Sequence, residues 1–360
     1  MSRSKSVIRR ILALVTVAVM AAVCLGGCGG SGTKNDTAGS GEKPGTIIEE
    51  TDSSITVIDQ ANREVTVKKN PESIALCYRV AIRFLLSLDQ GDKITGIGKT
   101  EDFLEMLQPS LKDCADVGKG VVDIEALAEL KPDLFFHKAS DVEGLEAVQE
   151  IGIPAVGIEI ETPEDILVAL DLMGKVCGAQ EKARELADYY NNQLDEIGSI
   201  TAQIKEKDKA TAIVMGSSIG KVADGTMLQG EMLEKAGAVN CASELEATEL
   251  WPTAGTEQIF AWNPEYIFIS NSESAVYDAD DILRDKNWSE MEAVKKKHVK
   301  VMPAQIDSWE FPGIVSVLGI YYMIHEMYPE LVSDETLENK VNEFYELSYG
   351  RIFDREELGY

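Results

Sequence analysis

The chain has 360 residues, of which 44% are hydrophobic, and a formal net charge of −28. This length is enough for about two domains with buried cores, which excludes a short peptide or an extended tail. The acidic balance excludes nucleic acid as a partner, and it excludes attachment to anionic lipid through a basic patch.

Residues 1–27 have the pattern of an export signal. A basic segment from Arg3 to Arg10 precedes an apolar run at 11–25, which is shorter than the ~20 residues of a membrane-spanning helix. A retained transmembrane helix is the alternative. The quartet Leu-Gly-Gly-Cys that ends at Cys28 resembles the lipobox of bacterial lipoproteins. This resemblance implies cleavage before Cys28 and a lipid on its sulfur, which anchors the protein outside the cytoplasm on the cell membrane.

Residues 28–52 are expected to form a flexible tether, because residues 29–45 are rich in Gly, Ser, Thr, Lys, Asn and Asp and show no apolar periodicity. Beyond the tether, Cys77, Cys114, Cys177 and Cys241 have no CxxC or zinc-type spacing, so we expect structural roles and leave a disulfide open. With only three histidines and no Asp/His cluster, a site for a bare metal ion is not expected.

From residue 53 onward, short β-type runs alternate with helical patterns, which predicts α/β units with parallel strands. The first lobe covers 53–162 and has candidate strands at 74–77, 94–97, 134–136 and 155–158. Two successive helices separated by Gly178 are expected over 163–207, and a second lobe with closing helices over 208–360. The predicted fold is two α/β lobes, each with a mainly parallel sheet flanked by helices, joined by a long rigid helix.

A repeated segment supports two similar lobes. Glu125 precedes Pro132 by seven residues and Asp133 by eight, and Glu257 precedes Pro264 and Glu265 by the same intervals. Each copy has the pattern of a short helix opened by an acid, a proline stop and a buried strand. Two copies 132 residues apart predict twin lobes with a binding cleft between them.

These segments resemble the helical-hinge (class III) periplasmic binding proteins, which serve ABC importers of ferric siderophores, haem and vitamin B12. The opening at 58–74 is similar to the family's first hairpin and strand, and 318–345 is similar to its closing helices. The resemblance implies a monomeric binding protein rather than an enzyme, which delivers its ligand to a permease dimer with ATPase subunits. It also implies that Glu125 and Glu257 dock on permease arginines; the alternative is that they only complement their helix dipoles.

Ligands of open α/β sheets meet the carboxyl ends of the strands, so the residues after each predicted strand are candidate contacts. In the first lobe these are Tyr78, Arg79, Lys99 to Phe103, His137 and Lys138, with Arg83 one helical turn further on. In the second lobe they are Ser217, Ser218, Trp251, Ser270, Asn271 and Trp309.

The residue types narrow the ligand without fixing it. Trp251 offers a flat apolar surface for a macrocycle or a catecholate, and Trp309 with Phe311 is a comparable candidate; core packing is the alternative. Arg79 and Arg83 suit an anionic chelate, which favours a ferric siderophore. His137 or Tyr78 suits the axial position of a haem, so haem and corrinoids stay open.

The motifs of two enzyme classes are incomplete or absent in the sequence. Gly96 to Thr100 resembles the end of a phosphate-binding loop, but Lys93 stands where the motif needs its first glycine. A secreted hydrolase is the other alternative, but the sequence contains no nucleophile elbow that would support it. Binding without chemistry is therefore expected.

Overall fold

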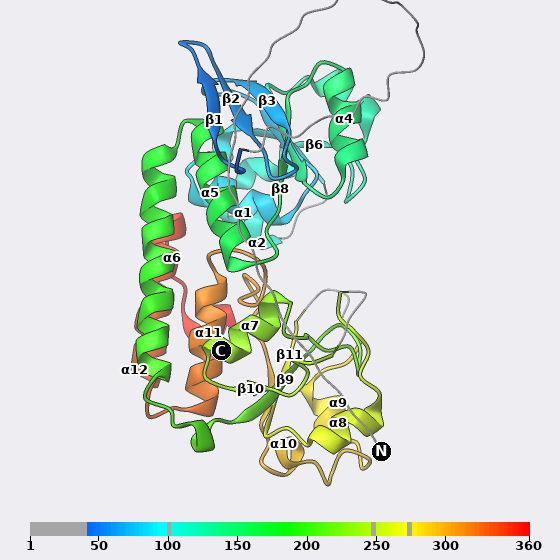
Figure 1. The fold of residues 1–360 in the computed structure, drawn as a ribbon, viewed down its shortest axis with the longest axis vertical. Helices are drawn as coiled ribbons and strands as arrows, with labels where there is room; N and C mark the ends of the chain where they lie inside the picture. The colour runs from blue at the N-terminus through cyan, green and yellow to red at the C-terminus, as the bar shows by residue number, and fades with distance from the viewer. Residues whose placement is uncertain (1–41, 99–101, 246–249, 272–275) are drawn as a thin grey trace, which may run out of the picture. The chain divides into compact units, whose positions relative to one another are not determined.

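The structure is a computed structural model that describes residues 42–98, 102–245, 250–271 and 276–360 (Figure 1). The expected signal segment, Cys28 and most of the expected tether lie outside these ranges. Within them, none of the helices combines the length and the apolar character needed to cross a membrane. The described cysteines Cys77, Cys114, Cys177 and Cys241 are unpaired thiols.

The N-terminal lobe contains a five-stranded parallel sheet in the order β6-β5-β4-β7-β8. Its strands are β4 (Ile74–Leu76), β5 (Ile94–Ile97), β6 (Ala115–Asp116), β7 (Leu134–Lys138) and β8 (Ala155–Ile158). Its helices are α1 (Val80–Ser87), α2 (Asp102–Leu107), α3 (Ile124–Leu130) and α4 (Val142–Glu150). Strands β4 and β8 are buried along their whole length, because helices cover a parallel sheet on both faces.

A separate antiparallel sheet precedes this lobe and corrects the expected tether. It consists of β1 (Ile47–Glu50), β2 (Ser54–Ile58) and β3 (Glu64–Lys68). Strand β1 falls within 28–52, where a flexible tether was expected, so that prediction is wrong for its last residues. The sequence did not indicate β1 because all four of its residues are exposed, which leaves no apolar alternation to detect.

A buried carboxylate fastens this hairpin to the lobe. Asp59 is fully buried at the end of β2, where its carboxylate accepts hydrogen bonds from the Arg63 guanidinium and from the Gly157 N–H of β8 at 2.9 Å. Arg63 also donates to the Ala155 carbonyl at 2.8 Å. The hairpin is therefore held by a buried ion pair whose remaining hydrogen-bonding groups are satisfied by the backbone of β8, by the Gln149 side chain and by N–H groups of the turn itself.

Two helices link the lobes, as predicted. Helix α5 (Pro163–Cys177) begins with a capping box between Thr162 and Asp165, and it ends at Gly178, whose φ of 74° is the left-handed conformation that glycine adopts without strain. Helix α6 (Gln180–Thr201) follows directly, and its 22 residues span about 33 Å. The two helices pack along each other, so the connection is rigid rather than a loose linker.

The C-terminal lobe has a four-stranded parallel sheet in the order β10-β9-β11-β12. Its strands are β9 (Thr211–Met215), β10 (Val239–Asn240), β11 (Tyr266–Ile269) and β12 (Val299–Val301), and its helices are α7 (Leu228–Lys235), α8 (Thr256–Trp262), α9 (Ala279–Arg284) and α10 (Glu292–Lys295). The chain closes with α11 (Ser316–Met327), α12 (Asp334–Tyr349) and α13 (Arg355–Leu358). Helix α11 packs on α6 and α7, and α12 packs on α1 of the other lobe. The predicted two-lobe α/β class is confirmed.

The repeated segments form the same unit in both lobes. Helices α3 and α8 each have seven residues and end at a left-handed residue, Lys131 and Asn263, before the proline and the strand. In the first lobe the Ser73 hydroxyl accepts the Asp133 N–H at 2.9 Å, and the Asp133 carboxylate accepts the Ser73 N–H at 3.3 Å.

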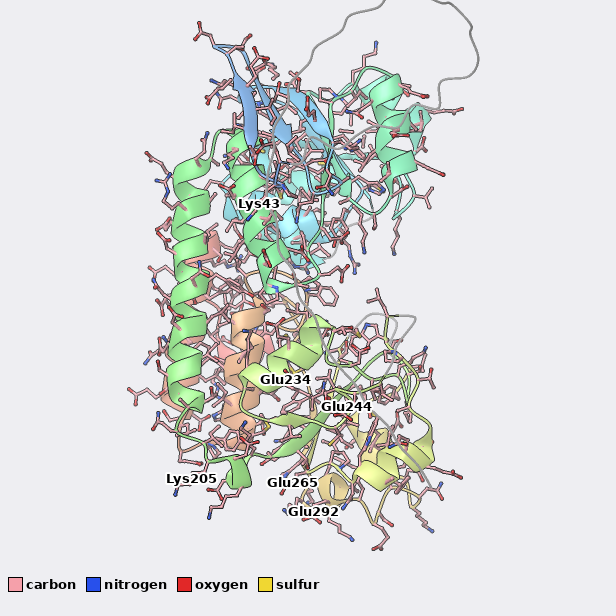
Figure 2. The ribbon with its side chains drawn as sticks, viewed as in Figure 1. Lys43, Lys205, Glu234, Glu244, Glu265 and Glu292 are labelled. Atoms are coloured by element: carbon pink, nitrogen blue, oxygen red, sulfur yellow. The ribbon has the colours of Figure 1, made fainter. Side chains whose placement is uncertain are left out.

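Thr211 and Glu265 repeat this exchange in the second lobe. The Thr211 hydroxyl accepts the Glu265 N–H at 3.1 Å, and the Glu265 carboxylate accepts the Thr211 N–H at 3.3 Å. Glu265 lies beside Glu292, and the Lys296 ammonium contacts both carboxylates (Figure 2). In each lobe, the acidic residue of the repeat therefore links two neighbouring parallel strands and fixes their register.

The Asp59 ion pair gives a test of the hairpin. Asp59→Asn removes the charge and leaves the Arg63 guanidinium without its carboxylate, so we expect the free energy of unfolding to fall by about 3 kcal/mol. Urea titrations measure this change. Asp280→Asn, which breaks the exposed pair with Arg284, is the control and is expected to have little effect. Equal losses in the two variants would contradict a special role for the buried pair.

Candidate functional site

A pocket of about 320 Å³ lies at the carboxyl ends of the C-terminal lobe strands. Ser217 follows β9 and Ser270 follows β11, so both come from the point where the strand order reverses, which is the usual binding position in such sheets. Glu161 of the N-terminal lobe also lines the pocket. The other lining residues are Thr226, Met227, Leu228, Gln229, Leu250, Trp251, Glu310, Phe311 and Pro312.

Trp251 is held in one orientation in this pocket. Its φ of 57° is in the left-handed region that a tryptophan rarely adopts. Its backbone N–H donates to the Met227 sulfur at 3.3 Å. Its indole lies against Gly216, where an added Cβ would come within 2.7 Å of the ring. Gly216 is therefore needed for the close approach, and an unusual backbone conformation at a pocket wall is consistent with a functional position.

Glu310 places a buried carboxyl in the wall of the same pocket. The residue is 1% exposed, and its Oε1 accepts hydrogen bonds from the Ser270 hydroxyl at 2.8 Å and the Ser308 hydroxyl at 3.2 Å. Burial raises the pKa of the Glu310 carboxyl, and these hydroxyl donors only partly offset the effect. A carboxyl held in this way offers oxygen atoms to hydrogen-bond donors and provides no positive charge for an anion.

The charge of the pocket is the reverse of what an anionic ligand needs. Among the described residues that line it, two are glutamates and none is a lysine or arginine. The nearby ammonium of Lys138 is engaged by Glu161 at 2.8 Å and by Glu159 at 3.6 Å. Burial lowers the pKa of Lys138, whereas the contact with Glu161 raises it, and the net effect is an increase. Lys138 therefore keeps its positive charge, and the Glu161 carboxylate balances that charge.

A second pocket of about 380 Å³ lies at the strand ends of the N-terminal lobe. Tyr78 and Arg79 line it after β4, together with Lys119 from the segment before α3. The Lys138 ammonium lies 5.9 Å from the centre of the Tyr78 ring, and Glu161 binds the same ammonium. Contacts among Tyr78, Lys138 and Glu161 therefore run from the second pocket to the first, and we call the two pockets together with these three residues the two-lobe groove.

Tyr78 is a neutral phenol in this groove. Burial, followed by the charges of Glu161 and Glu159, raises the pKa of Tyr78 well above its ordinary value. A phenolate is therefore disfavoured at this position when no cation is bound.

Three predicted ligand contacts lie elsewhere. Trp309 is fully buried in the core, where its Nε1 donates to the Tyr345 hydroxyl at 3.1 Å, so its predicted ligand contact is wrong. His137 is 2% exposed, and its Nε2 is bound to Asp141 at 2.7 Å. Arg83 is also buried, and its Nε binds Asp307 at 2.6 Å. The pockets lie at the edge of the sheet that the strand-end rule indicates. The rule does not determine whether a side chain after a strand points into a pocket or into the core.

Glu161 and Glu310 were missed by the sequence reasoning. Glu161 comes three residues after β8, so applying the strand-end rule to that strand as well would have found it. Glu310 lies between Trp309 and Phe311, which are both candidate ligand contacts from the sequence. Gln229 sits at the start of α7 and gave no strand-end signal. Lys99, Thr100 and Glu101 lie outside the described residues.

The predicted docking glutamates occupy matching positions. Glu125 and Glu257 are both exposed and both lie in the first turn of their helices, α3 and α8. Each helix begins the repeated unit described above, so the two carboxylates have the same local geometry. Their role in docking stays a prediction.

Several curated proteins are similar to the chain over most of its length. The molybdate-binding protein MolA of Haemophilus influenzae is 25% identical over 329 residues, covering 81% of this chain and 90% of the relative. The uncharacterised ABC transporter substrate-binding lipoprotein YvrC of Bacillus subtilis is 24% identical over 87% of this chain and 95% of its own. A vitamin B12-binding protein of Yersinia pestis is 22% identical over 59% of this chain and 71% of its own.

The fold also matches solved structures. A periplasmic solute-binding protein from Veillonella parvula superposes with a TM-score of 0.75 and 26% identity, covering 84% of this chain and 95% of that structure. Residues 74–306, which are more than half of the chain, match the family model described as periplasmic binding protein. The twin parallel sheets, the helical connection and this match agree: the chain belongs to the family of periplasmic binding proteins.

Proposed function

We propose that this protein is the substrate-binding lipoprotein of an ABC importer and that it captures a corrinoid in the two-lobe groove. The observation that carries the ligand class is the pocket of Trp251 and Glu310, whose described lining has two carboxyls and no cationic side chain. A corrinoid has a broad flat ring system with neutral amide arms, which suit aromatic walls, hydroxyls and carboxylate acceptors. The vitamin B12-binding relatives support this choice.

A ferric siderophore, which the sequence favoured, is supported less well. That expectation rested on Arg79 and Arg83 as anchors for an anionic chelate. Arg83 is engaged with Asp307, and among the described residues that line the second pocket the cationic side chains are Arg79 and Lys119. A tris-catecholate, whose charge is strongly negative, would place anionic oxygens near Glu161 and Glu310.

Haem and molybdate are also less well supported. Of the predicted axial groups for haem, Tyr78 is held as a neutral phenol and His137 is buried against Asp141. Molybdate, named for one relative, is a small oxyanion that needs converging donors and positive charge. The described lining of the first pocket has no cationic side chain to supply this charge.

Transport rather than catalysis follows from the family, and the remaining steps are part of the proposal. The lipidated Cys28 holds the monomer at the membrane, and the relative from Bacillus subtilis is likewise named a substrate-binding lipoprotein of an ABC transporter. Glu125 and Glu257 dock the loaded protein on the permease dimer and its ATPase subunits. The strongly acidic surface disfavours nucleic acid as a partner.

Cyanocobalamin binding tests the ligand class. We expect the purified protein to bind cyanocobalamin more tightly than haemin, a ferric tris-catecholate or molybdate in isothermal titration calorimetry. Trp251→Ala removes the aromatic wall and is expected to weaken binding about tenfold or more. Trp288→Phe, a change at a core tryptophan that does not line the pocket, is the control. Tighter binding of the catecholate than of cyanocobalamin would refute the assignment.

Glu310→Gln tests the buried carboxyl through the pH dependence of stability. Because burial raises the pKa of Glu310, ionisation costs more in the folded than in the unfolded chain. This loss of stability is complete above the raised pKa and vanishes as the pH falls below the ordinary value of 4.5. Glu310→Gln should therefore increase the free energy of unfolding more at about pH 7.5 than at about pH 4.

Urea titrations of the variant and the native protein at both pH values measure this difference. Glu146→Gln, the same substitution on the exposed side of α4, is the control. A pH-independent effect of Glu310→Gln would contradict the raised pKa.

The docking role is tested with Glu125→Ala and Glu257→Ala combined. We expect this variant to bind cyanocobalamin as the native protein does, because both residues lie outside the two pockets, but to lose stimulation of the permease ATPase in proteoliposomes. Glu143→Ala with Asp280→Ala changes one exposed first-turn acid in each lobe and is the matched control. Loss of ligand affinity in the docking variant, or full ATPase stimulation, would exclude the assigned role.

A further inference from the structure

A buried ion pair joins the two lobes beside the ligand pocket. Arg83 belongs to helix α1 of the N-terminal lobe, and its Nε donates to Asp307 Oδ1 at 2.6 Å. Asp307 lies in the segment 302–315, which connects β12 to α11 in the C-terminal lobe. The side chains of Arg83 and Asp307 are 6% and 0% exposed, so water does not screen their attraction.

Two buried tyrosines of α12 are within the electrostatic reach of this pair. After burial, the charge of Asp307 is the largest cause that raises the pKa of Tyr345 and of Tyr349. Tyr345 also accepts the Trp309 N–H, and Trp309 belongs to the same 302–315 segment. The ion pair therefore lies in an enclosed environment, where its geometry is well defined.

The same guanidinium reaches the pocket through an aromatic ring. The Arg83 Cζ atom lies 5.5 Å from the centre of the Phe311 ring, within the range of a cation–π contact. Phe311 lines the pocket, and so does its neighbour Glu310, whereas Arg83 does not. One side chain thus pairs with Asp307 through its Nε atom and places its guanidinium carbon over a pocket-lining ring.

We propose that Arg83 is a positioning residue for ligand binding: its pairing with Asp307 fixes the 302–315 segment against α1 and holds the Phe311 ring at the pocket wall. Arginine suits this role because its planar group can form hydrogen bonds at its edge while an aromatic ring packs on its face. A lysine at this position can pair with Asp307 but offers no planar face. The inference uses the proposed function only in taking the pocket as the ligand site.

The first experiment separates positioning from folding. Arg83→Met combined with Asp307→Leu replaces both charges by apolar side chains, a change that often preserves the stability of a buried pair. We expect the melting temperature to stay near that of the native protein, while the Kd for cyanocobalamin rises about tenfold because Phe311 is no longer held. Arg83→Lys keeps the charge and is expected to raise Kd to a similar extent.

Non-additivity then identifies Phe311 as the intermediary. Phe311→Leu alone should raise the Kd for cyanocobalamin, and adding it to the Arg83→Met, Asp307→Leu protein should raise Kd little further. Fully additive effects, or an unchanged Kd in the pair-replaced protein, would overturn the proposal.

A second measurement needs no ligand. In protein labelled with 4-fluorophenylalanine, the fluorine-19 resonance of residue 311 is assigned by its absence in Phe311→Leu. We expect this resonance to shift or broaden in Arg83→Lys and in the pair-replaced protein, while the resonance of Phe135, in the N-terminal lobe core, stays unchanged. An unchanged resonance of residue 311 would overturn the proposal even if cyanocobalamin does not bind, in which case the ligand assignment fails separately.

Discussion

A parallel sheet brings the carboxyl ends of all its strands to one edge, and this constraint determines where the protein can bind. The strand orders β5-β4-β7-β8 and β10-β9-β11-β12 are the same arrangement used twice. In each sheet the order reverses beside the first strand, β4 or β9, where helices leave the strand ends uncovered. The two pockets lie at these two positions, and the row of Tyr78, Lys138 and Glu161 connects them.

The balance of charges in the groove has a physical explanation. Glu310 is buried without a cationic partner among its described contacts and is stabilised by hydroxyl donors, so its charge remains costly. Lys138, which could have attracted an anion, is bound by two glutamates instead. The C-terminal part of the groove therefore favours a ligand with hydrogen-bond donors. The cationic residues Arg79 and Lys119 line the pocket in the N-terminal part.

Much of the fold could be predicted because its main signals are local. Buried apolar runs predicted β5 and β8 with their observed bounds, and Gly178 predicted the break between α5 and α6. The missed elements had weak signals. Strands β6 and β10 have two residues each, and β1 has no buried residue, so neither length nor alternation revealed them.

The site was predicted less completely, because burial depends on contacts between distant segments. Three of the candidate contacts, Tyr78, Ser217 and Trp251, line the two pockets. Arg83 and Trp309 were expected at the same edge, but partners 224 and 36 residues away in the chain draw them into the interior. No local pattern in the sequence identifies such partners.

The packing of α12 on α1 has a consequence for the order of folding. Helix α1 belongs to the first lobe, yet its covering comes from residues 334–349, near the end of the chain. The buried rings of Phe344 and Tyr345 are part of the same core as Phe84 and Leu85. During synthesis the first lobe consequently lacks one wall until residues 334–349 have left the ribosome, so the nascent chain cannot complete this lobe from its own residues alone.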